Sequence, residues 1–97
     1  MGIKWYTRTI SSNAIDTNRK QFIEISATGD LYNIYPVVTG TEVTLMAASG
    51  ATVTISGSSG NIKMTGSFSL GQYDTVTFKV EPSGAYWIPS GGKNNNA

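Results

Sequence analysis

The sequence of 97 residues contains neither cysteine nor histidine, and only 13% of its residues are charged. Without cysteine and histidine, disulfide bonds and the usual zinc, haem and iron–sulfur sites are excluded. Ser-His-Asp and Cys-His nucleophiles are excluded for the same reason. We therefore expect no cofactor and no metal. The fold has to be held by side-chain packing or by association with other chains.

Charge and hydropathy argue against two kinds of partner. Seven basic and six acidic residues give a net charge of +1, which is not the electrostatic footprint of a nucleic-acid binder. No apolar run reaches the ~18–20 residues that a membrane span needs. Residues 1–5 do not lead into the apolar region of a signal peptide. We expect neither nucleic-acid binding nor membrane insertion.

The residues that are abundant are typical of β structure. Ser, Thr, Asn and Gly make up 41 of the 97 residues, Ile and Val add 15, and Leu occurs three times. Apolar and polar residues alternate along short segments that are separated by turn residues. Residues 11–19 are predicted to form turns rather than a helix. The predicted strands cover residues 3–10, 21–26, 31–35, 42–47, 52–56, 62–65, 67–70, 75–80 and 86–88.

This pattern predicts a single all-β domain over residues 1–97, with short antiparallel strands in a sandwich or a barrel-like arrangement. An antiparallel sheet is expected because one face of each strand is apolar and the other carries Thr, Ser or Lys. The turn spacing is not an exact repeat, so it does not indicate a solenoid. Residues 90–97 are predicted to form a flexible tail. The predicted core or subunit-contact residues are Val43, Leu45, Val53, Ile55, Ile62, Met64, Phe68, Val76, Phe78, Val80 and Trp87.

Few residues offer chemistry. Glycosidases need two carboxylates ~5–10 Å apart, and no spacing in the sequence pairs any two of the six acidic residues. An enzyme that uses carboxylates and Tyr73 is therefore the least favoured hypothesis, and we expect no catalysis. Exposed aromatic rings could instead contact a receptor. The candidates for this role are Tyr73, Tyr32, Tyr35 and Trp5.

The sequence from Asp30 onward resembles a β-rich module at the C-terminal ends of bacteriophage tail fibre, tailspike and head fibre proteins. The resemblance covers about two-thirds of the chain and divides it into N-terminal strands (1–29), a fibre-tip-like module (30–89) and the tail (90–97). It is carried by Asp30-Leu31-Tyr32-Asn33-Ile34, Gly40-Thr41-Glu42-Val43-Thr44-Leu45, Val53-Thr54, Gly60-Asn61-Ile62-Lys63-Met64 with Gly66 and Phe68, Asp74-Thr75-Val76-Thr77-Phe78, and Gly84-Ala85-Tyr86-Trp87.

The resemblance implies a structural domain of the virion surface, made in the host cytoplasm, that trimerises or caps a fibre or spike. A homotrimer is the partner that it predicts. Association would also cover apolar strand faces that a chain of this length covers only in part. A host glycan- or protein-binding module with exposed aromatic rings is the alternative, and one scaffold can serve both roles.

Overall fold

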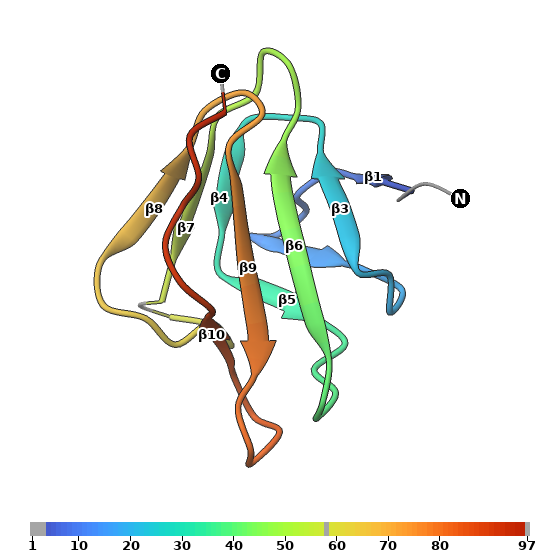
Figure 1. Cartoon of the computed structure of the whole chain (residues 1–97), viewed down its shortest axis with the longest axis vertical. Helices are drawn as coiled ribbons and strands as arrows, with labels where there is room; N and C mark the ends of the chain where they lie inside the picture. Colours follow the sequence, from blue (N-terminus) through green and yellow to red (C-terminus); the bar gives the residue numbers. More distant parts are fainter. Residues whose placement is uncertain (1–3, 58, 97) are drawn as a thin grey trace.

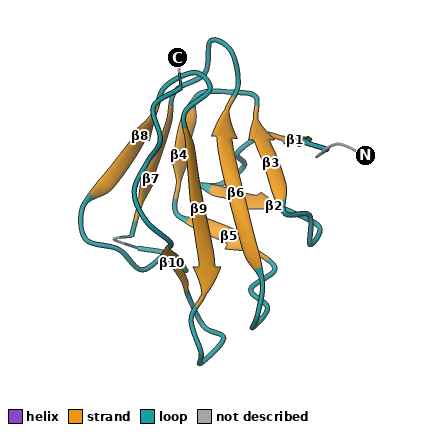
Figure 2. Ribbon diagram, in the orientation of Figure 1, coloured by secondary structure: helices purple, strands orange, loops and turns teal. Residues whose placement is uncertain are grey.

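The computed structural model describes residues 4–57 and 59–96, and within these ranges it contains strands and no helix (Figure 1, Figure 2). The all-β prediction is therefore confirmed. Ile3 of the first predicted strand and Ala97 of the predicted tail lie outside the described residues. The strands are β1 (Tyr6–Arg8), β2 (Ala14–Asp16), β3 (Phe22–Ile25), β4 (Gly29–Leu31), β5 (Asn33–Tyr35), β6 (Glu42–Ala47), β7 (Val53–Ser56), β8 (Ser67–Leu70), β9 (Thr75–Val80) and β10 (Trp87–Pro89).

The strands form three sheets around one core. The large sheet has the order β1-β3-β6-β9-β10, the three-stranded sheet β4-β7-β8, and the two-stranded sheet β2-β5. In Figure 1 the large sheet lies in front, with β5 behind it and β4, β7 and β8 to its left. The result is a sandwich-like domain in which the strands stack from β1 on the right to β8 on the left.

Four of the seven strand pairings are parallel, which corrects the expectation of antiparallel strands. From β3 to β7 the chain passes through all three sheets in turn, and β6 and β7 pair in parallel with β3 and β4. The fold is thus a short three-sided coil that ends in antiparallel strands. The parallel partners include Tyr6↔Ile23, Ala14↔Asn33, Phe22↔Thr44 and Gly29↔Val53.

The spacing between parallel partners differs at all four pairings, which explains why no repeat is visible in the sequence. The antiparallel prediction relied on alternating apolar and polar residues. In this fold the parallel strands alternate too, because only one face of each sheet is buried. Three pairings are antiparallel: β6–β9, β7–β8 and β9–β10.

The predicted turn at residues 11–19 contains a strand, and the predicted strand at 31–35 is broken. Ser12 and Asn13 have φ values of 52° and 61°, as a two-residue type I′ turn requires, and β2 follows directly. The Asn13 carbonyl then accepts hydrogen bonds from the N–H groups of Tyr32 (2.8 Å) and Asn33 (3.1 Å). The chain therefore turns a corner at Tyr32, which separates β4 from β5.

Two predicted elements near the end of the chain also differ. The strand expected at 62–65 is reduced to a parallel bridge between Ile62 and Trp87. The segment expected to be a flexible tail follows β9: Asn94 and Thr75 exchange backbone hydrogen bonds of 2.9 and 3.0 Å. Asn96 donates hydrogen bonds to Asp74 Oδ1 at 3.1 Å and to the Tyr73 carbonyl at 3.0 Å, so the contacts of this segment extend through residue 96.

A single copy of the chain covers its own apolar faces. Nine of the predicted core residues are buried, whereas Met64 and Phe68 are half-buried against the core. One copy of the chain thus buries these residues itself, because the coil places its three sheets around the core. The core comprises Ile15, Ile23, Ile25, Leu31, Ile34, Val43, Leu45, Ala47, Ala51, Val53, Ile55, Ile62, Leu70, Val76, Phe78, Val80 and Trp87.

Candidate binding site

The four aromatic candidates for receptor contact lie apart on the structure. Tyr35 and Tyr73 are 49% and 43% exposed, whereas Tyr32 and Trp5 are half-buried. Trp5 packs edge-on against Phe22 with ring centroids 5.4 Å apart. Tyr73 lies in a turn with φ of 67°. Of these four, Tyr35 lines a hollow of a size suited to a small ligand.

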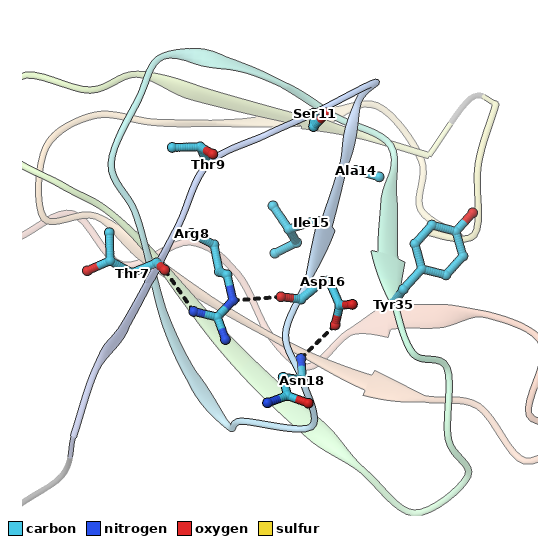
Figure 3. A pocket seen from close by; sticks show the side chains of 9 residues that line it. All are labelled: Thr7, Arg8, Thr9, Ser11, Ala14, Ile15, Asp16, Asn18 and Tyr35. Carbon is cyan, nitrogen blue, oxygen red and sulfur yellow. Dashed lines mark hydrogen bonds between the residues drawn. The ribbon is translucent and has the colours of Figure 1, made fainter.

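This hollow, of about 790 Å³, opens between β1 and the hairpin that carries β2. Figure 3 shows its lining: β1 and the residues after it on one side, β2 in the middle, and the Tyr35 ring on the other side. Most of the lining side chains are polar. They belong to Thr7, Arg8, Thr9, Ser11, Ala14, Ile15, Asp16, Asn18 and Tyr35.

Arg8 joins the two edge strands that border the hollow. Its Nε donates to the Asp16 carbonyl at 2.7 Å, and its Nη1 donates to the Thr7 carbonyl at 2.8 Å (Figure 3). Both carbonyls point away from the paired strand of their own sheet. The next residue along the chain points toward that strand in each case: the Arg8 carbonyl accepts the Ser26 N–H, and the Thr17 N–H donates to the Tyr35 carbonyl. One guanidinium thus occupies the acceptors that a further strand would use.

Asp16 and Tyr35 lie side by side because they are register partners in the β2–β5 pair. Both are exposed, and their buried neighbours Ile15 and Ile34 point into the core. Asp16 Oδ1 accepts the Asn18 N–H at 2.8 Å, which closes an Asx turn. The carboxylate is therefore held in place beside the aromatic ring (Figure 3).

Polar side chains also occupy carbonyls at both edges of the three-stranded sheet. Asn13 Nδ2 donates to the Asp30 carbonyl of β4 at 3.2 Å. Lys93 Nζ donates to the Ser69 carbonyl of β8 at 2.9 Å. Because β4 and β8 are the outer strands of the three-stranded sheet, both of its edges carry such a contact. Occupied edges of this kind resist pairing with another chain.

Asp74 and Glu81 hold turns, and this role sets their ionisation. The N–H groups of Asn96 (3.1 Å) and Gly71 (2.9 Å), with Lys93 Nζ at 3.6 Å, lower the pKa of Asp74 against the opposing effect of burial. Contacts of Glu81 with the Ser83 hydroxyl and N–H, and then with the N–H of Ala85, lower its pKa to about 2.

The two carboxylates with shifted pKa values are thus ionised and engaged with backbone donors of their own turns. A general acid at neutral pH needs a raised pKa, so neither group is suited to that role. Tyr73 precedes Asp74 in this turn, and its N–H donates to the Ala47 carbonyl at 2.7 Å.

Sequence reasoning missed Arg8, Asp16 and Asn18 as site residues. Arg8 looked like an ordinary charge on a strand, and the other two looked like turn residues. The type I′ signal at Ser12-Asn13 could have indicated a hairpin at this place. Nothing in the sequence shows that the hairpin lies beside β1.

Neither family models, nor curated proteins, nor solved structures gave a match to this chain. No helix in the described part of the chain is long and apolar enough to cross a bilayer. Among residues 4–57 and 59–96, no cluster of three Asp or Glu side chains could hold a metal ion.

Proposed function

We propose that this chain is a non-catalytic structural domain of a bacteriophage fibre or spike, which caps the fibre as a homotrimer on the virion surface. The observation that carries the proposal is the change of strand direction along the stack. In the first part of the coil, β6 and β7 pair in parallel with β3 and β4 of the preceding turn. The strands that follow, β8, β9 and β10, pair antiparallel with their neighbours. Antiparallel strands stop a parallel coil from continuing, as a capping domain requires. The resemblance of residues 30–89 to fibre-tip modules supports the class.

The capped strand edges limit how copies of this chain can assemble. A trimer has to form through side-chain faces, because Arg8, Asn13 and Lys93 occupy edge carbonyls. The outer face of the large sheet is suited to this role. The half-buried Phe22 and Trp5 lie there, at the β1–β3 side of the sheet. Next to Phe22 in register is Thr44, whose hydroxyl is hydrogen-bonded to that of Thr77 at 2.9 Å.

Native mass spectrometry and sedimentation equilibrium test the assembly. We expect a species of three times the 10.3 kDa chain mass at micromolar concentration. Phe22→Glu should dissociate it into folded monomers, since three carboxylates would be buried at the contact. Tyr73→Glu introduces the same charge at an exposed turn and should leave the trimer intact. A monodisperse monomer of the unmodified chain would refute the proposal.

A saccharide-binding module is the second candidate function, and the hollow beside Tyr35 favours it. Its volume lies within the ~300–1,000 Å³ typical of small-molecule sites. A glycan array separates the two functions. A stable trimer that gives no signal on the array supports the capping role alone, whereas a signal from a monomer supports the binding role alone.

A further inference from the structure

We infer that the hollow between β1 and the β2 hairpin binds a neutral saccharide of one or two sugar units, with Tyr35 stacking on a sugar face and Asp16 and Arg8 binding its hydroxyl groups. This inference rests on the second candidate function and assigns its site and its ligand class. Three properties of the hollow carry it: its aromatic wall, its balanced charge and the rigidity of its polar groups.

The aromatic wall is the phenol ring of Tyr35. It is 49% exposed, the largest exposed fraction among the large hydrophobic residues in the described part of the chain, and it borders the hollow from β5. Tyr86 is also exposed, but Lys63 Nζ lies over its ring at 4.7 Å from the centroid. Tyr6 has Lys4 and Lys20 near its ring. The Tyr35 ring has no such cation among the described residues and can receive the C–H face of a sugar.

The charge of the hollow favours a neutral ligand. Its ionised side chains are one cation, Arg8, and one anion, Asp16. A phosphate or a carboxylate would meet the Asp16 charge, and an ammonium group would meet the Arg8 charge. A sugar hydroxyl both donates and accepts, so it can bind a carboxylate and a guanidinium at once. The hydroxyls of Thr7, Thr9 and Ser11 extend this polar lining.

The charged groups are fixed before a ligand arrives. Two hydrogen bonds, to the Thr7 and Asp16 carbonyls, orient the Arg8 guanidinium. No described residue accepts a hydrogen bond from its Nη2, which leaves these donors for a ligand. Asp16 Oδ1 is held by Asn18 N–H, and no described residue donates to Oδ2. Because these side chains are already ordered, binding costs little conformational entropy.

Titration of the ¹⁵N-labelled full chain tests the site. The probes are D-glucose, D-galactose, D-mannose, N-acetyl-D-glucosamine and the disaccharides maltose, cellobiose and lactose, with N-acetylneuraminic acid as the anionic comparison. We expect at least one neutral sugar to shift amide signals of residues 7–9, Asp16 and Tyr35. N-acetylneuraminic acid should bind more weakly than that sugar. Shifts confined to Tyr73, Tyr32 or Trp5 would overturn this site, although they would support a binding module.

Variants then separate stacking from hydrogen bonding. Tyr35→Ala should weaken binding about tenfold or more, and Tyr35→Phe should retain most of it, since the ring provides the contact. Asp16→Asn keeps an acceptor for the Asn18 N–H and should also weaken binding about tenfold. Tyr86→Ala, at another exposed tyrosine, is the matched control and should bind like the unmodified chain. Equal binding by Tyr35→Ala would overturn the inference.

The outcome is independent of the assembly proposal. No shift with any of the seven neutral sugars would refute the saccharide site, whether the chain is a trimer or a monomer. Binding that Tyr35→Ala abolishes, observed on a monomer, would support the site and refute the trimeric cap. Preferential binding of N-acetylneuraminic acid would replace the neutral ligand class by an anionic one and overturn the charge argument.

Discussion

The two ends of the fold, at β1–β2 and at β9–β10, are closed in different ways. At the β1–β2 end, side chains close the edges: Arg8 binds the carbonyls of Thr7 and Asp16, and Asn13 binds that of Asp30. At the β9–β10 end, the main chain does most of the closing. Trp87 exchanges backbone hydrogen bonds with residues 61 and 63, and residues 90–94 run along β9. Side-chain contacts occur at this end as well, among them that of Lys93 with the Ser69 carbonyl of β8.

The difference shows how one small fold can separate stability from recognition. At the β9–β10 end, main-chain hydrogen bonds cover strand edges, and Phe78, Val80 and Trp87 belong to the core, although Ile88 is 37% exposed. Side-chain caps occupy hydrogen-bonding groups without filling the volume above them, and the hollow remains at the β1–β2 end. Both solutions prevent strand addition, but only the second leaves room for a ligand.

The largest expected effect comes from the core of the main-chain-covered end. Phe78 is fully buried in β9, and Phe78→Ala should lower the free energy of unfolding by about 3–5 kcal/mol. Ile15, 2% exposed beneath the hollow, offers the comparison. Ile15→Ala should cost only about 2–3 kcal/mol, because water from the hollow can fill the space. Urea denaturation measures the loss of unfolding free energy in both variants. A larger loss for Ile15→Ala would place the dominant core at the β1–β2 end.

Removing the side-chain cap should have the next largest effect. Arg8→Ala breaks two hydrogen bonds and should cost about 1–2 kcal/mol, since water can replace part of the interaction. It should also expose edge acceptors and increase self-association beyond that of the unmodified chain, measured by light scattering. Arg8→Lys can bind only one of the two carbonyls well, so its stability and its self-association should lie between those of Arg8→Ala and of the unmodified chain. An unchanged association state in Arg8→Ala would show that the guanidinium does not protect the edge.

These two ends also differ in how much the sequence could predict. The alternation at 42–47 and 75–80 predicted β6 and β9 with the same bounds as in the structure, because apolar side chains such as Phe78 face a core that every β arrangement needs. Strand direction could not be predicted in this way. Both parallel and antiparallel strands bury one face here, so the alternation of Ile23 and Ile25 is the same in either case.

The candidate site was less accessible to prediction because it depends on long-range placement. Tyr35 was among the predicted contact residues, but its partner Asp16 is beside it only through the β2–β5 register. Arg8 reaches Asp16 only because β1 and β2 belong to different sheets that meet at one end of the coil. No local pattern in residues 4–20 contains that information.

A pH-dependent comparison follows from Asp74, which fastens the tail to the β9 end. In the folded chain its pKa lies below the ordinary value of 3.8, mainly because the N–H groups of Asn96 and Gly71 bind the carboxylate. The unfolded chain therefore binds more protons between the two pKa values. The contribution of Asp74 to stability is full above its unfolded pKa and is lost as pH falls through the folded value.

Asp74→Asn should thus destabilise the protein at neutral pH, and this deficit should shrink at acidic pH. Urea curves of both chains at neutral pH and at about pH 3 measure the change. The amide of Asn96 should exchange faster in the variant at neutral pH, because the tail loses its anchor. A deficit that is the same at both pH values would show that the carboxylate charge does not fasten the tail.

The smallest effect is expected from Glu81, in the turn between β9 and β10. Its carboxylate contacts only residues two to five positions away in sequence, including the N–H groups of Ser83 (2.9 Å), Ala85 (3.0 Å) and Tyr86 (3.3 Å). These local contacts lower its pKa from 4.5 to about 2, so the ionised form favours the turn down to strongly acidic pH.

Glu81→Gln should therefore accelerate amide exchange at residues 83–86 while leaving the urea midpoint nearly unchanged. Ser83→Ala, which removes the hydroxyl that also contacts Glu81, should show a weaker form of the same effect. Because β10 is held independently by residues 61–63, opening the turn does not release the strand. A fall in the urea midpoint comparable to that of Phe78→Ala would mean that the turn, and not the main-chain cover, secures this end of the fold.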